Sequence, residues 1–311
     1  MRKVLVTGGA GFIGSHLVDR LVEDSQVVVL DDLSTGLIEN IFQHIDNRKI
    51  EFIQGSILNE EDLNRALEGV TTVFHFAAQP DVRVSVEKPF FDFEVNVVGG
   101  MKLLEAMRRA NIMRLVFVSS GGTVYGEPER FPTPENTPLR PISNYGAAKA
   151  AFEMYLSSYA ELYEMVFASM RLANVIGPRS THGVIYDFVK KLEKDPSRLV
   201  VLGDGTQNKE YISVTDVVAA AICIANNMKE GHVPVNVGSG ETLTITRIAK
   251  IVCEEMDSPD AKIEYTMTKR GWDGDVVRTD VDISLLKSMG WNPMRPIEDT
   301  VRQYIRWLRS H

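Results

Sequence analysis

Short apolar runs rich in β-branched residues alternate with longer helical patterns through the first two-thirds of this 311-residue chain. The predicted strands are Val4–Thr7, Val27–Leu30, Glu51–Ile53, Val73–Phe76, Leu115–Ser119 and Val166–Arg171. The predicted helices include Phe12–Glu23, Glu60–Leu67, Phe91–Ala110 and Tyr145–Glu164. Several strands are apolar throughout, which is typical of a parallel sheet with helices on both faces. The alternation therefore predicts an α/β chain with a Rossmann-like, doubly wound parallel sheet.

After about residue 174 this rhythm loosens, and Gly-rich stretches separate helices expected near 214–226, 245–256 and 297–309. We therefore expect residues 1–173 to form the sheet domain and residues 174–311 to form mainly a smaller C-terminal α/β substrate-binding domain. The apolar run Val235–Val237 indicates that a segment near 212–240 returns to the sheet. Five prolines between Gly126 and Asn144 predict a stiff, functional loop.

Charge and composition narrow the class of protein. The formal net charge is −8, which argues against a nucleic-acid or anionic-membrane binder because both need a basic surface. The two cysteines, Cys223 and Cys253, lie in apolar helical patterns and are expected to be buried reduced thiols. No apolar run reaches the roughly 18 residues that a membrane span needs. The first strand starts almost at once, so no signal peptide is expected, and we expect a cytoplasmic protein.

The segment Thr7–Gly14 follows the first strand and opens the first helix. Its glycines fit the G-x-G-x-x-G pattern, in which glycine permits the tight turn, the close approach of a pyrophosphate and the contact between helix and strand. The N-terminus of the helix then offers free N–H groups to phosphates. The predicted dinucleotide contacts here are Gly8, Gly11, Phe12, Ile13 and Gly14.

The second strand ends at Asp31, twenty residues after Gly11. A carboxylate at this position would accept hydrogen bonds from a ribose and repel a 2′-phosphate, so the pattern favours NAD over NADP. Asp31 could instead be a turn-forming acid before Ser34-Thr35-Gly36. The predicted cofactor contacts after this strand are Asp31, Asp32, Ser34, Thr35 and Gly36.

Tyr145 and Lys149 begin a predicted helix and are separated by one turn, so they share a face. A nearby ammonium lowers the pKa of a phenol, and the phenolate could then take a proton from a sugar hydroxyl while hydride leaves the same carbon for NAD⁺. The Gly-rich end of the fifth strand contains Ser120 and Thr123, whose hydroxyls could reach the reacting oxygen. These hydroxyls could equally serve only the turn.

These motifs, in this order, resemble the extended short-chain dehydrogenase/reductase family, and within it the UDP-sugar 4-epimerases. The likeness covers nearly the whole chain. The motifs that carry it are Thr7–Gly14, Asp31–Gly36, His75–Gln79, Ser119–Gly126, Tyr145–Lys149, Arg171–Pro178, Gly203–Ile212 and Gly290–Pro293.

The resemblance implies that Tyr145 is the catalytic base and Lys149 its pKa modulator and ribose ligand. It implies further cofactor contacts at Ser56, Ile57, Phe76, Ala77, Ala78, Asn96 and Ser119. It implies substrate contacts at Arg83, Ser120, Gly121, Thr123, Tyr145, Asn174, Val184, Gln207, Lys209 and Arg270. Cations among them suit a pyrophosphate, although Lys209 and Arg270 could instead be solvated surface charges.

Three positions depart from the family pattern. Gly121 stands where most 4-epimerases have the catalytic Ser or Thr, so Ser120 is the first replacement candidate and Thr123 the second. Ser56 stands where an acid often contacts the adenine. Lys209 replaces a usual Arg and cannot make the same bidentate phosphate contact.

The leading prediction is NAD-dependent inversion of C4 of a UDP-hexose of the UDP-glucose/UDP-galactose type, through a transient 4-keto intermediate. One alternative is a nucleotide-sugar 4,6-dehydratase or decarboxylase, although Gly122-Thr123 replaces the Asp-Glu of related dehydratases. Arg83 could meet a substrate carboxylate, which leaves a UDP-uronate epimerase open. A non-catalytic NAD sensor is the remaining alternative. No metal is expected, and the resemblance implies a homodimer packed through the helices near 91–110 and 145–164.

Overall fold

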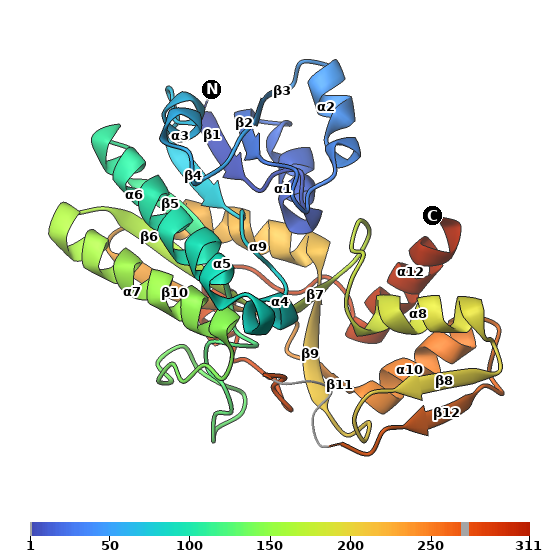
Figure 1. The fold of residues 1–311 in the computed structure, drawn as a ribbon. Coiled ribbons are helices and arrows are strands. Elements are labelled where there is room, and N and C mark those ends of the chain that lie inside the picture. Colours follow the sequence, from blue (N-terminus) through green and yellow to red (C-terminus); the bar gives the residue numbers. More distant parts are fainter. Residues whose placement is uncertain (1, 269–273) are drawn as a thin grey trace.

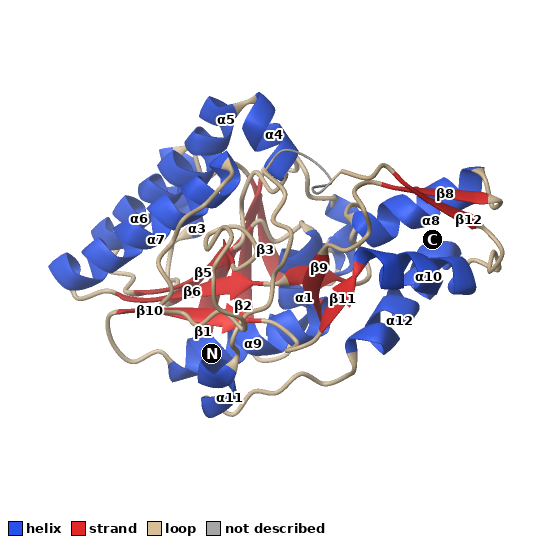
Figure 2. Ribbon diagram, turned by 90° about the horizontal axis from the view of Figure 1, so that it is seen from below, coloured by secondary structure: helices blue, strands red, loops and turns tan. Residues whose placement is uncertain are grey.

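The computed structural model describes residues 2–268 and 274–311, and it is built on one parallel sheet of seven strands (Figures 1 and 2). The strand order is β10-β6-β5-β4-β1-β2-β3, and every neighbouring pair is parallel. The strands are β1 (Arg2–Thr7), β2 (Ser25–Asp31), β3 (Ile50–Gln54), β4 (Thr72–His75), β5 (Arg114–Ser120), β6 (Val166–Leu172) and β10 (His232–Val237). The predicted α/β fold class with a doubly wound parallel sheet is confirmed.

The order of the strands determines where a ligand can bind. From β1 the chain runs outward through β2 and β3, and then returns to place β4 on the other side of β1. Thr7 lies opposite Leu30 and His75 in the two ladders that flank β1. In such sheets ligands bind beyond the carboxyl ends of the strands, at the point where the order reverses. The loops after β1, β2, β4 and β5 therefore surround the candidate site.

Helices cover both faces of the sheet (Figure 2). On one face α1 (Phe12–Leu21) and α9 (Val214–Asn227) pack with the strands, and on the other face α3 (Glu60–Ala66), α6 (Gly99–Arg109) and α7 (Asn144–Tyr163) do so. Side-chain caps explain where several of these helices begin. The side-chain Oδ1 of Asn59 accepts N–H bonds at the start of α3, and the hydroxyls of Ser143 and Ser213 do the same for α7 and α9.

A smaller lobe lies at one end of the sheet and carries the C-terminus (Figure 1). Its strands are β7 (Asn174–Ile176), β9 (Asn208–Ser213) and β11 (Thr242–Thr244) in one sheet, with β8 (Arg198–Val201) and β12 (Lys262–Tyr265) in another. Its helices are α8 (Val184–Lys194), α10 (Ile245–Glu255) and α12 (Ile297–Ser310), which share one apolar core. The remaining elements are η1 (Ile38–Asn40), α2 (Phe42–Asp46), α4 (Val82–Glu87), α5 (Pro89–Phe93), η2 (Glu94–Val98) and α11 (Ser284–Ser288).

Some local expectations differ from the structure. The helix expected over Phe91–Ala110 is three consecutive segments, because the π-helical η2 joins α5 to α6. The proline-rich loop after Gly126 is tied to the C-terminal part of the chain: Thr133 N donates to Asp280 O (2.8 Å) and Asp282 N donates to Thr133 O (2.9 Å). This loop therefore connects the segment after β5 to the chain near residues 280–282.

Three simple expectations concern cysteines, membranes and metals. Cys253 is buried, Cys223 is half-buried, and both are free thiols. Within the described ranges, no helix combines the length and the apolar character that crossing a membrane requires. The same residues hold no cluster of three or more His, Cys, Asp or Glu side chains suited to a metal ion.

Candidate functional site

The turn between β1 and α1 has a backbone that requires glycine. Gly8 has a φ of +69°, and a Cβ there would lie 2.6 Å from the backbone nitrogen of Ala77. A Cβ on Gly14 would overlap the carbonyl oxygen of Gly8. No described side chain caps α1 at Gly11, so the first N–H groups of the helix are available to an anion. This cradle fits the pyrophosphate of a dinucleotide.

Asp31 supports this turn from the end of β2. Its Oδ2 accepts the N–H of Ala10 (2.9 Å), and its Oδ1 accepts the N–H of Leu33 (2.8 Å). Burial raises the pKa of the carboxyl, and these backbone donors oppose that rise. Both alternatives considered for Asp31 thus have a physical basis, because the carboxylate organises its own turn and also lies beside the cradle. Asp32, by contrast, is exposed and accepts the N–H of Ser34 (2.9 Å).

The turn after β4 lies against the glycine turn. Phe76 N donates to Thr7 O (3.0 Å), and Ala77 N donates to Thr7 Oγ1 (3.3 Å). The side chain of Asn96 fixes this turn, since its Oδ1 accepts Gln79 N (3.0 Å) and its Nδ2 donates to Gln79 O (3.1 Å). Asn96 is therefore placed to shape the surface that Ala77 and Ala78 present.

The loops at the carboxyl ends of β1 to β4 and the first turn of α1 contain most of the residues expected to contact the cofactor. Those residues are Gly8, Gly11, Phe12, Ile13, Gly14, Asp31, Asp32, Ser34, Thr35, Gly36, Ser56, Ile57, Phe76, Ala77 and Ala78. Ser56 is joined to this region through its neighbour, because Gly55 N donates to Asp31 O (3.1 Å). The Ile57 side chain is only 5% exposed and belongs to the apolar core.

Tyr145 and Lys149 come from the first turns of α7. The ammonium of Lys149 lies 5.6 Å from the centroid of the Tyr145 ring and donates to Val118 O (3.0 Å) at the end of β5. Lys149 is only 2% exposed, and burial lowers its pKa to about 8, against the raising effects of Asp92 and Glu153. The predicted pair is therefore assembled where the strands end.

The electrostatics of Tyr145 differ from the sequence expectation. Burial, followed by the charge of Asp92, raises the pKa of its phenol. The expectation considered the ammonium of Lys149 alone and left out the cost of burying a phenolate. The surroundings of the phenol in this structure therefore favour its protonated form.

The structure also gives a reason for the unusual Gly121. A Cβ at this position would lie 2.9 Å from the Arg171 carbonyl oxygen and 3.2 Å from Val281 Cγ1. A serine or threonine would therefore not fit without displacing β6. Nearby, Thr123 Oγ1 is buried and has no hydrogen-bond partner among the described residues. Buried hydroxyls are usually paired, so Thr123 is suited to a ligand.

Ser119 was expected to contact the cofactor, but its hydroxyl donates to Glu153 Oε1 (2.5 Å) in the interior. Glu153 is also paired with Arg171, whose Nη2 lies 2.7 Å from Glu153 Oε2. Sequence reasoning missed this pair, although Glu153 lies one helical turn beyond Lys149. It also missed Asp92, a buried carboxylate one turn before Asn96.

The residues expected to bind the nucleotide sugar have mixed environments. Asn174 is exposed and donates to Glu210 O (2.9 Å), Val184 is half-buried at the start of α8, and Gln207 is 2% exposed. Lys209 is neither a surface charge nor a separate cation, because its Nζ lies 2.7 Å from the buried Asp275 carboxylate. Arg83 is exposed in α4, and its Nε is 3.7 Å from Asp81 Oδ1. Arg270 lies outside the described residues.

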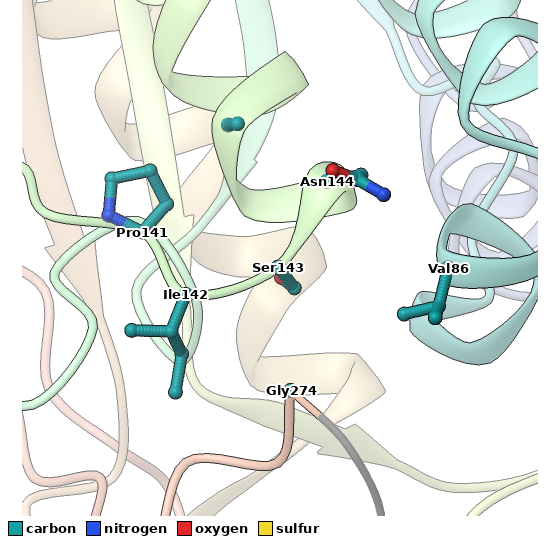
Figure 3. A pocket seen from close by; sticks show the side chains of 7 residues that line it. Val86, Pro141, Ile142, Ser143, Asn144 and Gly274 are labelled. Carbon is teal, nitrogen blue, oxygen red and sulfur yellow. The ribbon is translucent and has the colours of Figure 1, made fainter.

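A cavity of about 440 Å³ opens at the N-terminus of α7 (Figure 3). Its lining consists of Val86, Pro141, Ile142, Ser143, Asn144, Ala147 and Gly274. Figure 3 shows Val86 of α4 facing Asn144 across this space. Tyr145 and Lys149 do not line the cavity, so it adjoins this pair without containing it.

Comparisons with known proteins agree with this geometry. The model of the NAD dependent epimerase/dehydratase family matches residues 4–238. A putative UDP-glucose 4-epimerase of Methanocaldococcus jannaschii is 38% identical over 99% of both chains. The crystal structure of a Thermotoga maritima UDP-glucose 4-epimerase with UDP-glucose superposes with a TM-score of 0.90 at 35% identity, over 99% of both chains. A Thermus thermophilus UDP-glucose 4-epimerase in complex with NAD gives 0.88 at 37% identity, again over 99% of both.

Proposed function

This chain belongs to the NAD dependent epimerase/dehydratase family, and we propose that it inverts C4 of a UDP-hexose of the UDP-glucose/UDP-galactose type. The reaction proceeds through a transient 4-keto sugar. The full-length similarity to UDP-glucose 4-epimerases at 35–38% identity supports this proposal over dehydration.

The Tyr145–Lys149 pair at the end of β5, beside the glycine cradle after β1, is the observation that carries the proposal. A base must lie within hydrogen-bond reach of the proton that it takes. The base at the start of α7 and the cradle lie at the same end of the sheet, because the cradle follows β1 and Lys149 bonds the end of β5, with β4 between these strands. A substrate carbon can therefore face both.

Tyr145 takes the proton of the C4 hydroxyl and returns it to the carbonyl oxygen after the sugar has turned. Lys149 supplies a positive charge one turn away, which favours the phenolate. NAD held by this chain would supply the acceptor and donor of the C4 hydride and, in its oxidised form, a positive charge that favours the phenolate. The cradle of Gly8, Gly11 and Gly14 and the uncapped start of α1 hold the pyrophosphate.

Thr123 supplies the hydroxyl that bonds the reacting sugar oxygen in place of the residue missing at Gly121. Its buried, unpaired Oγ1 supports this role. We therefore rank Thr123 ahead of Ser120, in reverse of the sequence expectation. In solution a bound sugar would satisfy a hydroxyl that is otherwise costly to bury.

The nucleotide-sugar side is assigned to the smaller lobe. Asn174, Val184 and Gln207 contribute neutral contacts there. Lys209 acts together with Asp275, so its charge is largely compensated, and Arg270 is assigned the main diphosphate contact on the resemblance alone. Arg83 has an exposed position at the surface, which gives no support to a uronic acid as the preferred substrate.

The protein is proposed to be a cytoplasmic homodimer. Large apolar side chains are exposed along α5 and α7, including Phe90 (87%), Met154 (55%) and Leu162 (67%), and such patches mark interaction surfaces. Light scattering should give twice the chain mass, and Leu162→Glu should shift the protein towards the monomer. A monomeric unaltered protein would contradict the dimer.

The test of function is incubation of the purified protein with UDP-glucose, UDP-N-acetylglucosamine and UDP-glucuronate, followed by product analysis. The C4 epimer of UDP-glucose is expected. No net consumption of NAD should accompany its formation, because the hydride is returned in each cycle. Elimination products, or no turnover of any of the three, would overturn the proposal.

A further inference from the structure

Asp92 of α5 forms a buried cluster with two amides. The residue is 1% exposed, and its Oδ1 accepts hydrogen bonds from Gln79 Nε2 (2.8 Å) and Asn96 Nδ2 (3.0 Å). Gln79 and Asn96 also bond each other through the backbone of the turn after β4. The carboxylate is thus held rigidly beside the surface assigned to the nicotinamide.

This carboxylate acts on both members of the catalytic pair. Helix α5 packs against α7, and the charge of Asp92 raises the pKa values of both Tyr145 and Lys149. The negative charge of Asp92 therefore disfavours the phenolate of Tyr145 and favours the ammonium of Lys149, although Asp92 belongs to a different helix.

Among the residues that the structure describes, four titratable groups face Lys149. Two are acids, Asp92 from α5 and Glu153 from α7. The other two are Tyr145 and His75 of β4, and burial followed by the Lys149 charge lowers the pKa of His75 to about 3, so His75 is neutral near pH 7.

The two acids are not equivalent. Glu153 is compensated by the guanidinium of Arg171 at 2.7 Å, whereas the described residues that bond the Asp92 carboxylate are neutral amides. Both acids raise the pKa of Lys149, and the larger of the two effects comes from Asp92.

We propose that Asp92 is a positioning residue for the catalytic pair, which keeps Lys149 protonated in its buried position and so allows Tyr145 to act as a base. A buried lysine tends to lose its proton, and a neutral lysine cannot favour the phenolate. The inference deepens the proposed function and depends on it for the role of Tyr145. The same anion opposes ionisation of Tyr145 directly, so the two groups titrate as a coupled set.

The coupling predicts a specific signature in Asp92→Asn, which keeps the size of the side chain and removes its charge. Both limbs of the pH profile of kcat should move to lower pH, by about one unit each. At the alkaline end this gives a loss of about tenfold in turnover. Glu94→Gln, an exposed carboxylate two residues away, is the matched control and should leave both limbs in place.

A merely structural role gives a different result, because disturbing the turn would lower kcat without moving either limb. A lowered kcat with unmoved limbs in Asp92→Asn would therefore overturn the inference. Where the asparagine variant does not fold, Asp92→Ser removes the same charge with a smaller side chain and is measured in its place.

A second measurement does not depend on turnover. The pKa of Lys149 can be followed by NMR of protein with isotopically labelled lysine, with its signal identified by its loss in Lys149→Met. It should titrate at lower pH in Asp92→Asn than in the unaltered protein, and an unchanged titration would reject the inference. If no UDP-sugar is converted, the proposed function fails while this titration still decides the role of Asp92.

Discussion

The carboxylate of Glu153 and the guanidinium of Arg171 form a salt bridge of 2.7 Å, and their side chains are 0% and 4% exposed. Arg171 also donates to Tyr125 OH (2.9 Å) and to Glu135 O (2.8 Å). The pair thus joins α7, β6 and the segment after β5.

Arg171→Met should destabilise the protein by about 3–5 kcal/mol, because it leaves the charge of Glu153 buried without its partner. The free energy of unfolding from urea titration measures this. Arg108→Met breaks an exposed pair with Glu105 (2.9 Å) and serves as the control, for which little change is expected. Equal stability losses in the two variants would show that burial of the pair is unimportant.

Tyr145→Phe should reduce interconversion of UDP-glucose and UDP-galactose by at least about 100-fold, since the base is lost while the ring remains. NAD should still coelute with the variant, because the cradle after β1 is untouched. Tyr155→Phe, at an exposed position on the same helix, is the control. Near-normal turnover in Tyr145→Phe would remove Tyr145 from the mechanism.

Thr123→Val should lower turnover by about 10- to 100-fold while leaving the melting temperature unchanged or slightly raised. The hydroxyl has no described partner in the folded protein, so its replacement by a methyl group costs no hydrogen bond without substrate. Ser120→Ala should have the smaller effect on turnover. The reverse ranking would restore Ser120 as the hydroxyl that replaces the missing one at Gly121.

Glu210 should make stability depend on pH. It is 0% exposed, and its two oxygens accept Gly240 N and Val281 N, both at 2.7 Å. Burial nevertheless raises its pKa from 4.5 to about 7. Because the folded state holds this proton more tightly than the unfolded state, stability falls as pH rises from about 4.5 to about 7 and is constant above.

Unfolding measured across this range should therefore show a loss of about 3 kcal/mol attributable to Glu210. Glu210→Gln is less stable at low pH, since one acceptor becomes a donor, but this share of the pH dependence should disappear. A variant with the same slope as the unaltered protein would rule out Glu210 as its source.

The features that could be predicted from the sequence are those that depend on residues close together in the chain. Gly8 and Gly14 follow from a strand, a tight turn and a helix, and Tyr145 and Lys149 share a face because they are one turn apart. The sheet itself follows from the apolar strands and the helices between them. These patterns hold irrespective of what packs around them.

The missed features depend on residues that are distant in sequence. Lys209 is compensated by Asp275, which lies 66 residues further along the chain, and nothing local to Lys209 indicates this pairing. The rise in the pKa of Tyr145 comes from burial and from Asp92, whereas its sequence neighbourhood contains only Lys149. Ser119 was placed at the correct strand end, but which way its hydroxyl points depends on Glu153.

Strand β10 has a consequence for how the chain can be divided. It pairs with β6 in register from His232 opposite Phe167 to Val237 opposite Leu172, although β7, α8, β8 and β9 of the smaller lobe lie between them in sequence. A fragment cut after Ala173 would leave β6 as an exposed, largely apolar edge strand, which could pair with strands of other molecules. The two lobes are therefore not interchangeable modules, and swapping the smaller lobe between relatives must carry β10 with its own sheet.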